Sequence, residues 1–139
     1  MFKQIVIAND GSEGAFKALS FALDLAHLHH AHLHMLLVEE LPDFPASIDE
    51  VMEEKDEADH RFKAVIDRAQ ALAKLKHAKM EVHVLAGHPV RTIVDFLKDQ
   101  AIDHLVIGFM GHSALYERII GGTADRLVRF SPCSVTVVK

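Results

Sequence analysis

The sequence has a single cysteine, no long hydrophobic run and no excess of basic residues, and each shortage excludes a class of protein. Cys133 has no second cysteine with which to form an internal disulfide, so we expect a reduced setting. No apolar stretch approaches the roughly 18 residues of a membrane-spanning helix. The opening MFKQIVIANDGS lacks the basic, apolar and small-residue segments of a secretory signal. We therefore expect a cytoplasmic protein that does not associate with membranes.

The balance of charge is also informative. The formal net charge is −5, and no stripe of lysine and arginine is present. Binding to nucleic acid through the charge of its backbone is therefore not expected. A small anionic ligand is still compatible with this composition, because backbone amides can hold an anion without lysine side chains.

Segments typical of strands and helices alternate along the whole chain. Its 139 residues, half of them apolar, suit one domain over residues 1–139. Alternating strands and helices predict a parallel sheet covered by helices on both faces. Ser47 with Glu50 matches the capping box that begins a long helix, and Pro89 suits the first turn of the next one. The predicted strands are residues 2–8, 32–38, 79–86, 104–108 and 134–138.

A glycine-rich segment, VIGFMGHSALYERIIGGTADRL, lies between the fourth predicted strand and the last predicted helix. It holds four of the seven glycines, namely Gly108, Gly111, Gly121 and Gly122. Ligands of open α/β sheets bind beyond the carboxyl ends of the strands, and the start of a helix offers free amide donors. The spacing is neither that of a Walker loop nor G-x-G-x-x-G. On spacing alone, a phosphate-binding loop and a plain surface loop both stay open.

The whole chain resembles a universal stress protein of the UspA-like family. The resemblance rests on IVIANDGSEGA, on GHP before the third helix, on HLVIGFMGHSA and on the ending RFSPCSVTVVK. Its most specific motif is G-x2-G-x9-G-[ST], which marks the members of the family that bind ATP. Here Gly108, Gly111 and Gly121 keep that spacing. The resemblance implies a Rossmann-like sheet in the strand order 3-2-1-4-5, similar to the adenine nucleotide alpha hydrolase fold.

The resemblance also implies a set of nucleotide-binding residues. Asp10 would lie near the sugar or the phosphates, Val38 would line the adenine pocket, and the loop glycines would surround the phosphates. Each has a plainer alternative: Asp10 could stabilise a turn, and Val38 and Ile107 could be core residues. The full set is Ala8, Asn9, Asp10, Val38, Ile107, Gly108, Gly111, Gly121, Gly122, Thr123 and Ala124.

One position departs from the family pattern. Gly122 stands where the family has Ser or Thr, and Thr123 offers a hydroxyl one residue late. A lost hydrogen bond to a charged phosphate costs on the order of 1.5–3 kcal/mol. We therefore expect nucleotide affinity to be reduced roughly tenfold to a hundredfold rather than abolished.

Five histidines crowd into residues 27–34, namely His27, His29, His30, His32 and His34. Neutral imidazole is a common metal ligand. However, the segment spans a helix end and a strand start, so its rings should point in several directions. His32 and His34 would share one face of a strand, but two ligands do not make a site. We therefore expect no protein-bound metal here, and any Mg²⁺ only through nucleotide phosphates.

The resemblance favours a regulatory protein that binds ATP, or AMP or ADP, and acts as a stress-response homodimer. By that resemblance, strand 134–138 would pair with its copy in a second subunit, since an edge strand invites such pairing. Two alternatives stay open: a dimer that acts through a protein partner without nucleotide, and a slow ATP hydrolase. Catalysis beyond weak hydrolysis is not expected, because no general base is placed by the sequence.

Overall fold

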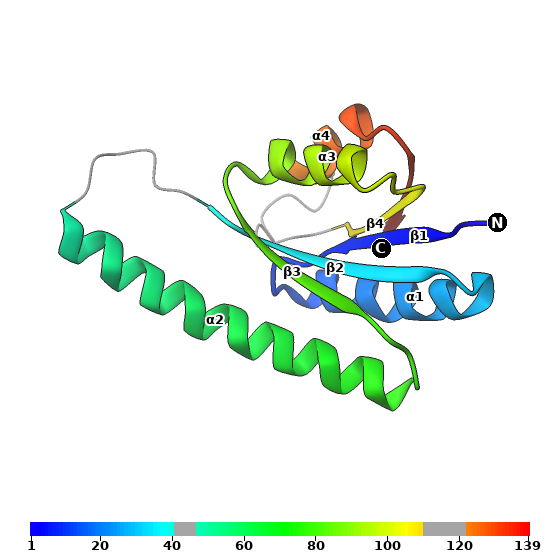
Figure 1. The fold of residues 1–139 in the computed structure, drawn as a ribbon, viewed down its shortest axis with the longest axis horizontal. Helices are drawn as coiled ribbons and strands as arrows, with labels where there is room; N and C mark the ends of the chain where they lie inside the picture. Colours follow the sequence, from blue (N-terminus) through cyan, green and yellow to red (C-terminus); the bar gives the residue numbers. More distant parts are fainter. Residues whose placement is uncertain (41–46, 110–121) are drawn as a thin grey trace.

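The computed structural model describes residues 1–40, 47–109 and 122–139. Over these residues the chain alternates strands with helices, as the sequence predicts (Figure 1). The elements are, in order, β1 (Gln4–Ala8), α1 (Glu13–His29), β2 (His32–Glu39), α2 (Ile48–Leu75), β3 (Glu81–Ala86), α3 (Pro89–Asp99), β4 (His104–Gly108), α4 (Gly122–Phe130) and β5 (Ser134–Val138).

The five strands form one parallel sheet in the order β3-β2-β1-β4-β5, which confirms the expected topology. Strand β1 therefore lies between β2 and β4, with Ile7 opposite both Met35 and Val106. The chain crosses from one half of the sheet to the other at β1 and β4. At such a point the connections leave in opposite directions, and a crevice opens at the carboxyl ends of the strands.

Helices cover both faces of the sheet (Figure 1). Helices α1 and α2 lie on one face, where Leu19 and Met35 belong to the same buried cluster. Helices α3 and α4 lie on the other, where Ile93 and Leu36 belong to a second cluster. The inner strands are mostly apolar in their central residues because both faces are covered, and Val6 is fully buried.

The predicted helix starts are confirmed. Ser47 and Glu50 form the capping box: Glu50 N–H donates to Ser47 Oγ at 3.2 Å, and Ser47 N–H donates to a Glu50 carboxylate oxygen at 3.4 Å. Pro89 is in the first turn of α3. Three strand boundaries differ slightly, since β1 and β3 each begin two residues later than predicted and β2 ends one residue later. No helix in the described ranges is both long and apolar enough to cross a membrane.

Candidate functional site

A cavity of about 340 Å³ lies at the carboxyl ends of β1, β2 and β4. The starts of α1, α3 and α4 also border it, so it occupies the crevice expected from the strand order. Its lining comprises Ala8, Asn9, Asp10, Ser12, Ala15, Leu36, Val38, Glu40, Pro89, Ile93, Ile107, Gly108, Phe109, Gly122, Thr123, Ala124 and Leu127.

The structure brings nine of the eleven predicted site residues to this one cavity. They come from four separate parts of the chain. The nine are Ala8, Asn9, Asp10, Val38, Ile107, Gly108, Gly122, Thr123 and Ala124. The other two predicted residues, Gly111 and Gly121, lie outside the described residues. Whether these positions bind a nucleotide stays a prediction, but their meeting at one cavity is a property of the fold.

Two side-chain hydrogen bonds shape the turn that follows β1. Asn9 is 3% exposed, and its Oδ1 accepts a hydrogen bond from Gly11 N–H at 2.9 Å. Asp10 Oδ1 accepts one from Ser12 N–H at 3.0 Å. Gly11 has a φ of 83°, a backbone conformation that glycine adopts without strain. Asp10 therefore has the turn-stabilising role that was one of its two expected roles, and its role toward a ligand stays a prediction.

The two described glycines of the loop motif differ in their surroundings. A Cβ on Gly108 would lie 2.8 Å from the carbonyl carbon and oxygen of Gly14 in α1. Helix packing against the end of β4 thus requires glycine at position 108, whatever binds in the cavity. Among the described residues, a Cβ on Gly122 would meet nothing within 4 Å. Position 122 therefore has room for a side chain.

The cavity has an apolar wall and few charges. Leu36, Val38, Ile93 and Ile107 supply apolar surface from β2, α3 and β4. None of the described lining residues is a lysine or arginine. Among the described residues, the groups that could hold an anion in the cavity are the backbone amides and hydroxyl groups at the starts of α1 and α4, where the helix dipole favours negative charge.

The sequence did not predict that α3, or α4 beyond its first turn, would line the cavity. Pro89 and Ile93 line the cavity from α3, and Leu127 lines it from α4. The GHP turn before α3 was a usable signal, because a turn after a strand ends at the same edge of a parallel sheet as the β1 and β4 turns. The place of Ile93 at the cavity could not be predicted in the same way, because it depends on how α3 crosses the sheet.

Cys133 lies outside this cavity. It is partly buried and packs against the apolar cluster beneath α3 and α4. Burial raises the pKa of its thiol, and the charge of Asp103 raises it further. A thiol of raised pKa is a poor nucleophile, and Cys133 here packs as a small hydrophobic residue.

The match to known proteins extends over the full chain. The model of the universal stress protein family matches residues 1–139. The chain belongs to the universal stress protein family. Within this family it is 26% identical to universal stress protein MJ0531 of Methanocaldococcus jannaschii, in an alignment that covers 100% of this chain and 83% of that protein.

Solved structures of the family share the fold. The universal stress protein UspA from Lactobacillus plantarum superposes with a TM-score of 0.87 at 27% identity, covering 99% of this chain and 98% of that one. A universal stress protein in complex with cAMP gives a TM-score of 0.74 at 24% identity, covering 99% and 97%. One from Archaeoglobus fulgidus in complex with dAMP gives 0.68 at 23% identity, covering 100% and 98%. The latter two likenesses establish the common fold.

Proposed function

We propose that this universal stress protein binds an adenine nucleotide in the cavity at the ends of β1 and β4 and acts as a regulatory dimer. The ligand would be ATP, or AMP or ADP, with any Mg²⁺ held through the phosphates. The observation that carries the proposal is the meeting of nine predicted binding residues, from four parts of the chain, around one cavity. Its volume of about 340 Å³ falls within the range of small-ligand pockets, roughly 300–1,000 Å³.

The two ends of the cavity suit the two ends of a nucleotide. Val38, Leu36 and Ile93 offer apolar surface for a flat base. At the other end, Gly122, Thr123 and Ala124 at the start of the nine-residue helix α4 line the cavity, and the first amides of a helix are good donors to an anion. This polarity supports a base on the β2 side and phosphates beside α4.

The two family structures with cAMP and dAMP support the adenine moiety in particular. Both ligands share adenine, a ribose-type sugar and one phosphate. A site common to the fold would therefore recognise the base and sugar, and the residues at the start of α4 would lie beside the phosphates. Gly122 affects the phosphate contacts, because the family pattern has a hydroxyl group at this position.

A matched pair of valine substitutions tests the site. Val38 lines the cavity, whereas Val84 lies on the neighbouring strand β3, is 47% exposed and does not line it. Calorimetric titration of nucleotide-free protein with ATP and Mg²⁺, and with AMP, should give micromolar binding for the wild type and for Val84→Phe. Val38→Phe should bind at least tenfold more weakly. Equal affinity of all three proteins, or no binding by wild type up to millimolar nucleotide, would refute the proposal.

A dimer that acts through protein contacts without nucleotide is the second candidate. Gly122 favours it, since a hydroxyl at this position marks the family members that bind ATP. In both candidates the edge strand β5 would pair with its copy, which leaves β3 at the two outer edges. Light scattering at micromolar concentration should report twice the chain mass of 15.5 kDa. A monomeric mass would contradict dimerisation and leave the nucleotide test unaffected.

Weak ATP hydrolysis is a further alternative that is easily separated from binding. The acidic groups along the described part of the cavity are Asp10 and Glu40. Phosphoryl transfer needs a positioned metal and a group that orients water. We expect phosphate release to stay at the rate of free ATP with Mg²⁺, as a colorimetric phosphate assay would show. A rate that rises with protein concentration and falls in Val38→Phe would instead establish the enzyme.

A further inference from the structure

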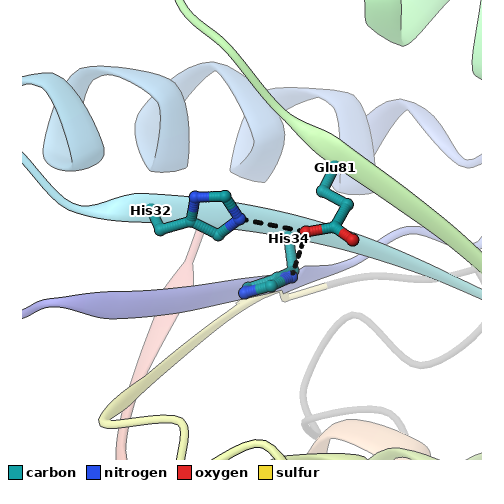
Figure 2. Close-up of side chains that lie close together, drawn as sticks. All are labelled: His32, His34 and Glu81. Carbon is teal, nitrogen blue, oxygen red and sulfur yellow. Dashed lines mark hydrogen bonds and ion pairs between the residues drawn. The ribbon is translucent and has the colours of Figure 1, made fainter.

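Three metal-ligating side chains meet on the α3 face of the sheet, away from the cavity (Figure 2). His32 and His34 lie two residues apart on β2, so both project from the same face. Glu81, the first residue of β3, lies opposite His34 in the parallel register and projects from that face too. The neighbouring strand therefore adds a third ligand to the two that the sequence identified.

The distances between the ligand atoms suit a single small cation. His32 Nε2 and His34 Nδ1 lie 3.0 and 3.6 Å from the same carboxylate oxygen of Glu81, and the three ligand atoms lie within 4.8 Å of one another. Two ligands at about 2.1 Å from a tetrahedral ion are about 3.4 Å apart. A modest shift of exposed side chains would therefore place all three atoms on one ion.

A hydrogen bond to Gln4 orients the most buried of these ligands. His34 Nε2 lies 2.9 Å from Gln4 Oε1 on β1. A carboxamide oxygen can only accept, so the His34 proton is on Nε2, and the Nδ1 lone pair faces His83 Nε2 at 3.0 Å, with Glu81 beside it at 3.6 Å. Metal-binding histidines characteristically use their second nitrogen in this way, which fixes the tautomer and the ring orientation.

A fourth donor lies beside the three. His83 Nε2 is 3.0 Å from His34 Nδ1 and 3.8 Å from Glu81 Oε1. Phe96 of α3 packs against both imidazole rings, with centroids 5.8 Å from His34 and 4.9 Å from His83. The cluster thus has an ordered apolar wall on its inner side.

The cluster is buried on its inner side and open to solvent on its outer side. The His34 side chain is 8% exposed, whereas those of His32 and Glu81 are each 53% exposed. An ion could therefore reach His32 and Glu81 from solvent and also bind the buried His34. The cluster lies at the starts of β2 and β3, and the cavity lies at the strand ends. His34 and Val38 are four residues apart on β2, a separation of about 13 Å.

We propose that His32, His34 and Glu81, with His83 beside them, form a binding site for a divalent transition-metal ion of the zinc class. Imidazole and carboxylate are ligands that Zn²⁺ shares with Cu²⁺ and Ni²⁺, and three protein ligands leave a position for water or for His83. The bound ion would tie the edge strand β3 to β2. The site does not depend on the proposed nucleotide function, and its test needs no nucleotide.

Metal-free protein titrated with Zn²⁺ and, separately, with Co²⁺ tests the proposal. Wild type should bind one equivalent of Zn²⁺ per chain, and its Co²⁺ form should show the visible absorption of a four-coordinate ion. The double variant His32→Ala with Glu81→Gln, both at exposed positions, should bind Zn²⁺ at least tenfold more weakly and lose the Co²⁺ band. Circular dichroism of both proteins checks that the fold is kept.

A chain with 11 histidines needs a matched control for unspecific binding. His27 and His30 are exposed residues of the same histidine-rich segment but lie at the end of α1. The double variant His27→Ala with His30→Ala should bind as wild type does. Gln4→Leu, which keeps all ligands but frees the His34 ring, should weaken binding about tenfold to a hundredfold. Loss in the control but not in the His32 and Glu81 variant would overturn the site, as would no stoichiometric binding by wild type.

Discussion

Gly108, the last residue of β4, lies directly against the backbone of Gly14 in the first turn of α1. A Cβ at position 108 would come within 2.8 Å of the Gly14 carbonyl group, closer than real Cβ atoms approach backbone. The first glycine of the loop motif is therefore needed for the packing of helix on strand. The presence of Gly108 is weaker evidence for phosphate binding than the presence of Gly111 and Gly121.

Gly108→Ala should consequently lower the stability of the free protein. Neither strand nor helix can yield at a backbone contact, so we expect a loss of about 1–3 kcal/mol in the free energy of unfolding. Gly122→Ala is the control, because a Cβ there meets none of the residues that the structure describes. It should leave stability unchanged or raise it by up to about 1 kcal/mol. Urea denaturation of both variants measures the difference, and equal stability would contradict the packing argument.

Gly122→Ser should strengthen nucleotide binding. The substitution restores the hydroxyl of the family pattern at a position with room for it. A hydrogen bond to a charged phosphate contributes about 1.5–3 kcal/mol, which corresponds to a tenfold to hundredfold gain in ATP affinity. Calorimetry on wild type, Gly122→Ala and Gly122→Ser separates the hydroxyl from the methylene. An affinity for ATP that is the same in the Ala and Ser variants would show that no phosphate lies beside this residue.

His104 should make the fold sensitive to acid. Its Nε2 lies 2.7 Å from Thr136 Oγ1, Phe2 stacks on its ring, and within the described part of the chain its buried Nδ1 has no hydrogen-bond partner. Burial lowers the pKa of His104. The charge of Asp103 opposes that shift, and His29 adds to it.

The sign of the effect follows from proton uptake. The unfolded chain binds a proton near pH 6.5, where the folded chain does not, so stability is complete above that pH and falls as pH decreases toward the folded pKa. His104→Leu should therefore lose less stability than wild type between pH 7.5 and 5.5, measured by urea midpoints. His60→Gln, at an exposed position of α2, should decline as wild type does. Some decline should persist in His104→Leu, because burial also lowers the pKa of His34.

Ser12 caps α1, and removal of its hydroxyl should lower the free energy of unfolding of the whole domain. Its Oγ accepts a hydrogen bond from Ala15 N–H at 3.1 Å, which satisfies one of the free amides of the first turn. Ser12→Ala should cost about 1 kcal/mol, whereas Ser12→Asp should keep the cap. Thermal or urea unfolding of both variants tests this. Equal loss in the two variants would mean that the hydroxyl serves something other than the cap.

The architecture could be predicted from the sequence because apolar strands and amphipathic helices alternate without interruption. The capping box at Ser47 and Pro89 at the start of α3 are local signals, and local signals suffice for helix starts. The strand order, by contrast, was predicted from the resemblance to a family and not from local signals. The pattern of apolar residues within β1 and within β4 does not indicate that these two strands are neighbours in the sheet.

The site was only partly predictable for the same reason. Ala8 ends a strand, and Asn9 and Asp10 begin the turn after it, so the sequence places them at a crevice. Ile93 reaches the same cavity from α3, which requires the crossing of helix over sheet. Likewise Glu81 joins His32 and His34 only through the register of β3 on β2. Pairing between strands distant in sequence is decided by the packing of the whole sheet, and no single segment encodes it.

Strand β2 carries the proposed metal ligands at its start and cavity residues at its end, all on one face. Because side chains alternate at every residue, an insertion or deletion of a single residue between His34 and Leu36 would turn one of these groups over onto the face of α1. The same change would bring one or more of the fully buried Leu33, Met35 and Leu37 to the α3 face. Homologous chains should thus vary in length in the connections between strands, while the number of residues in β2 stays constant.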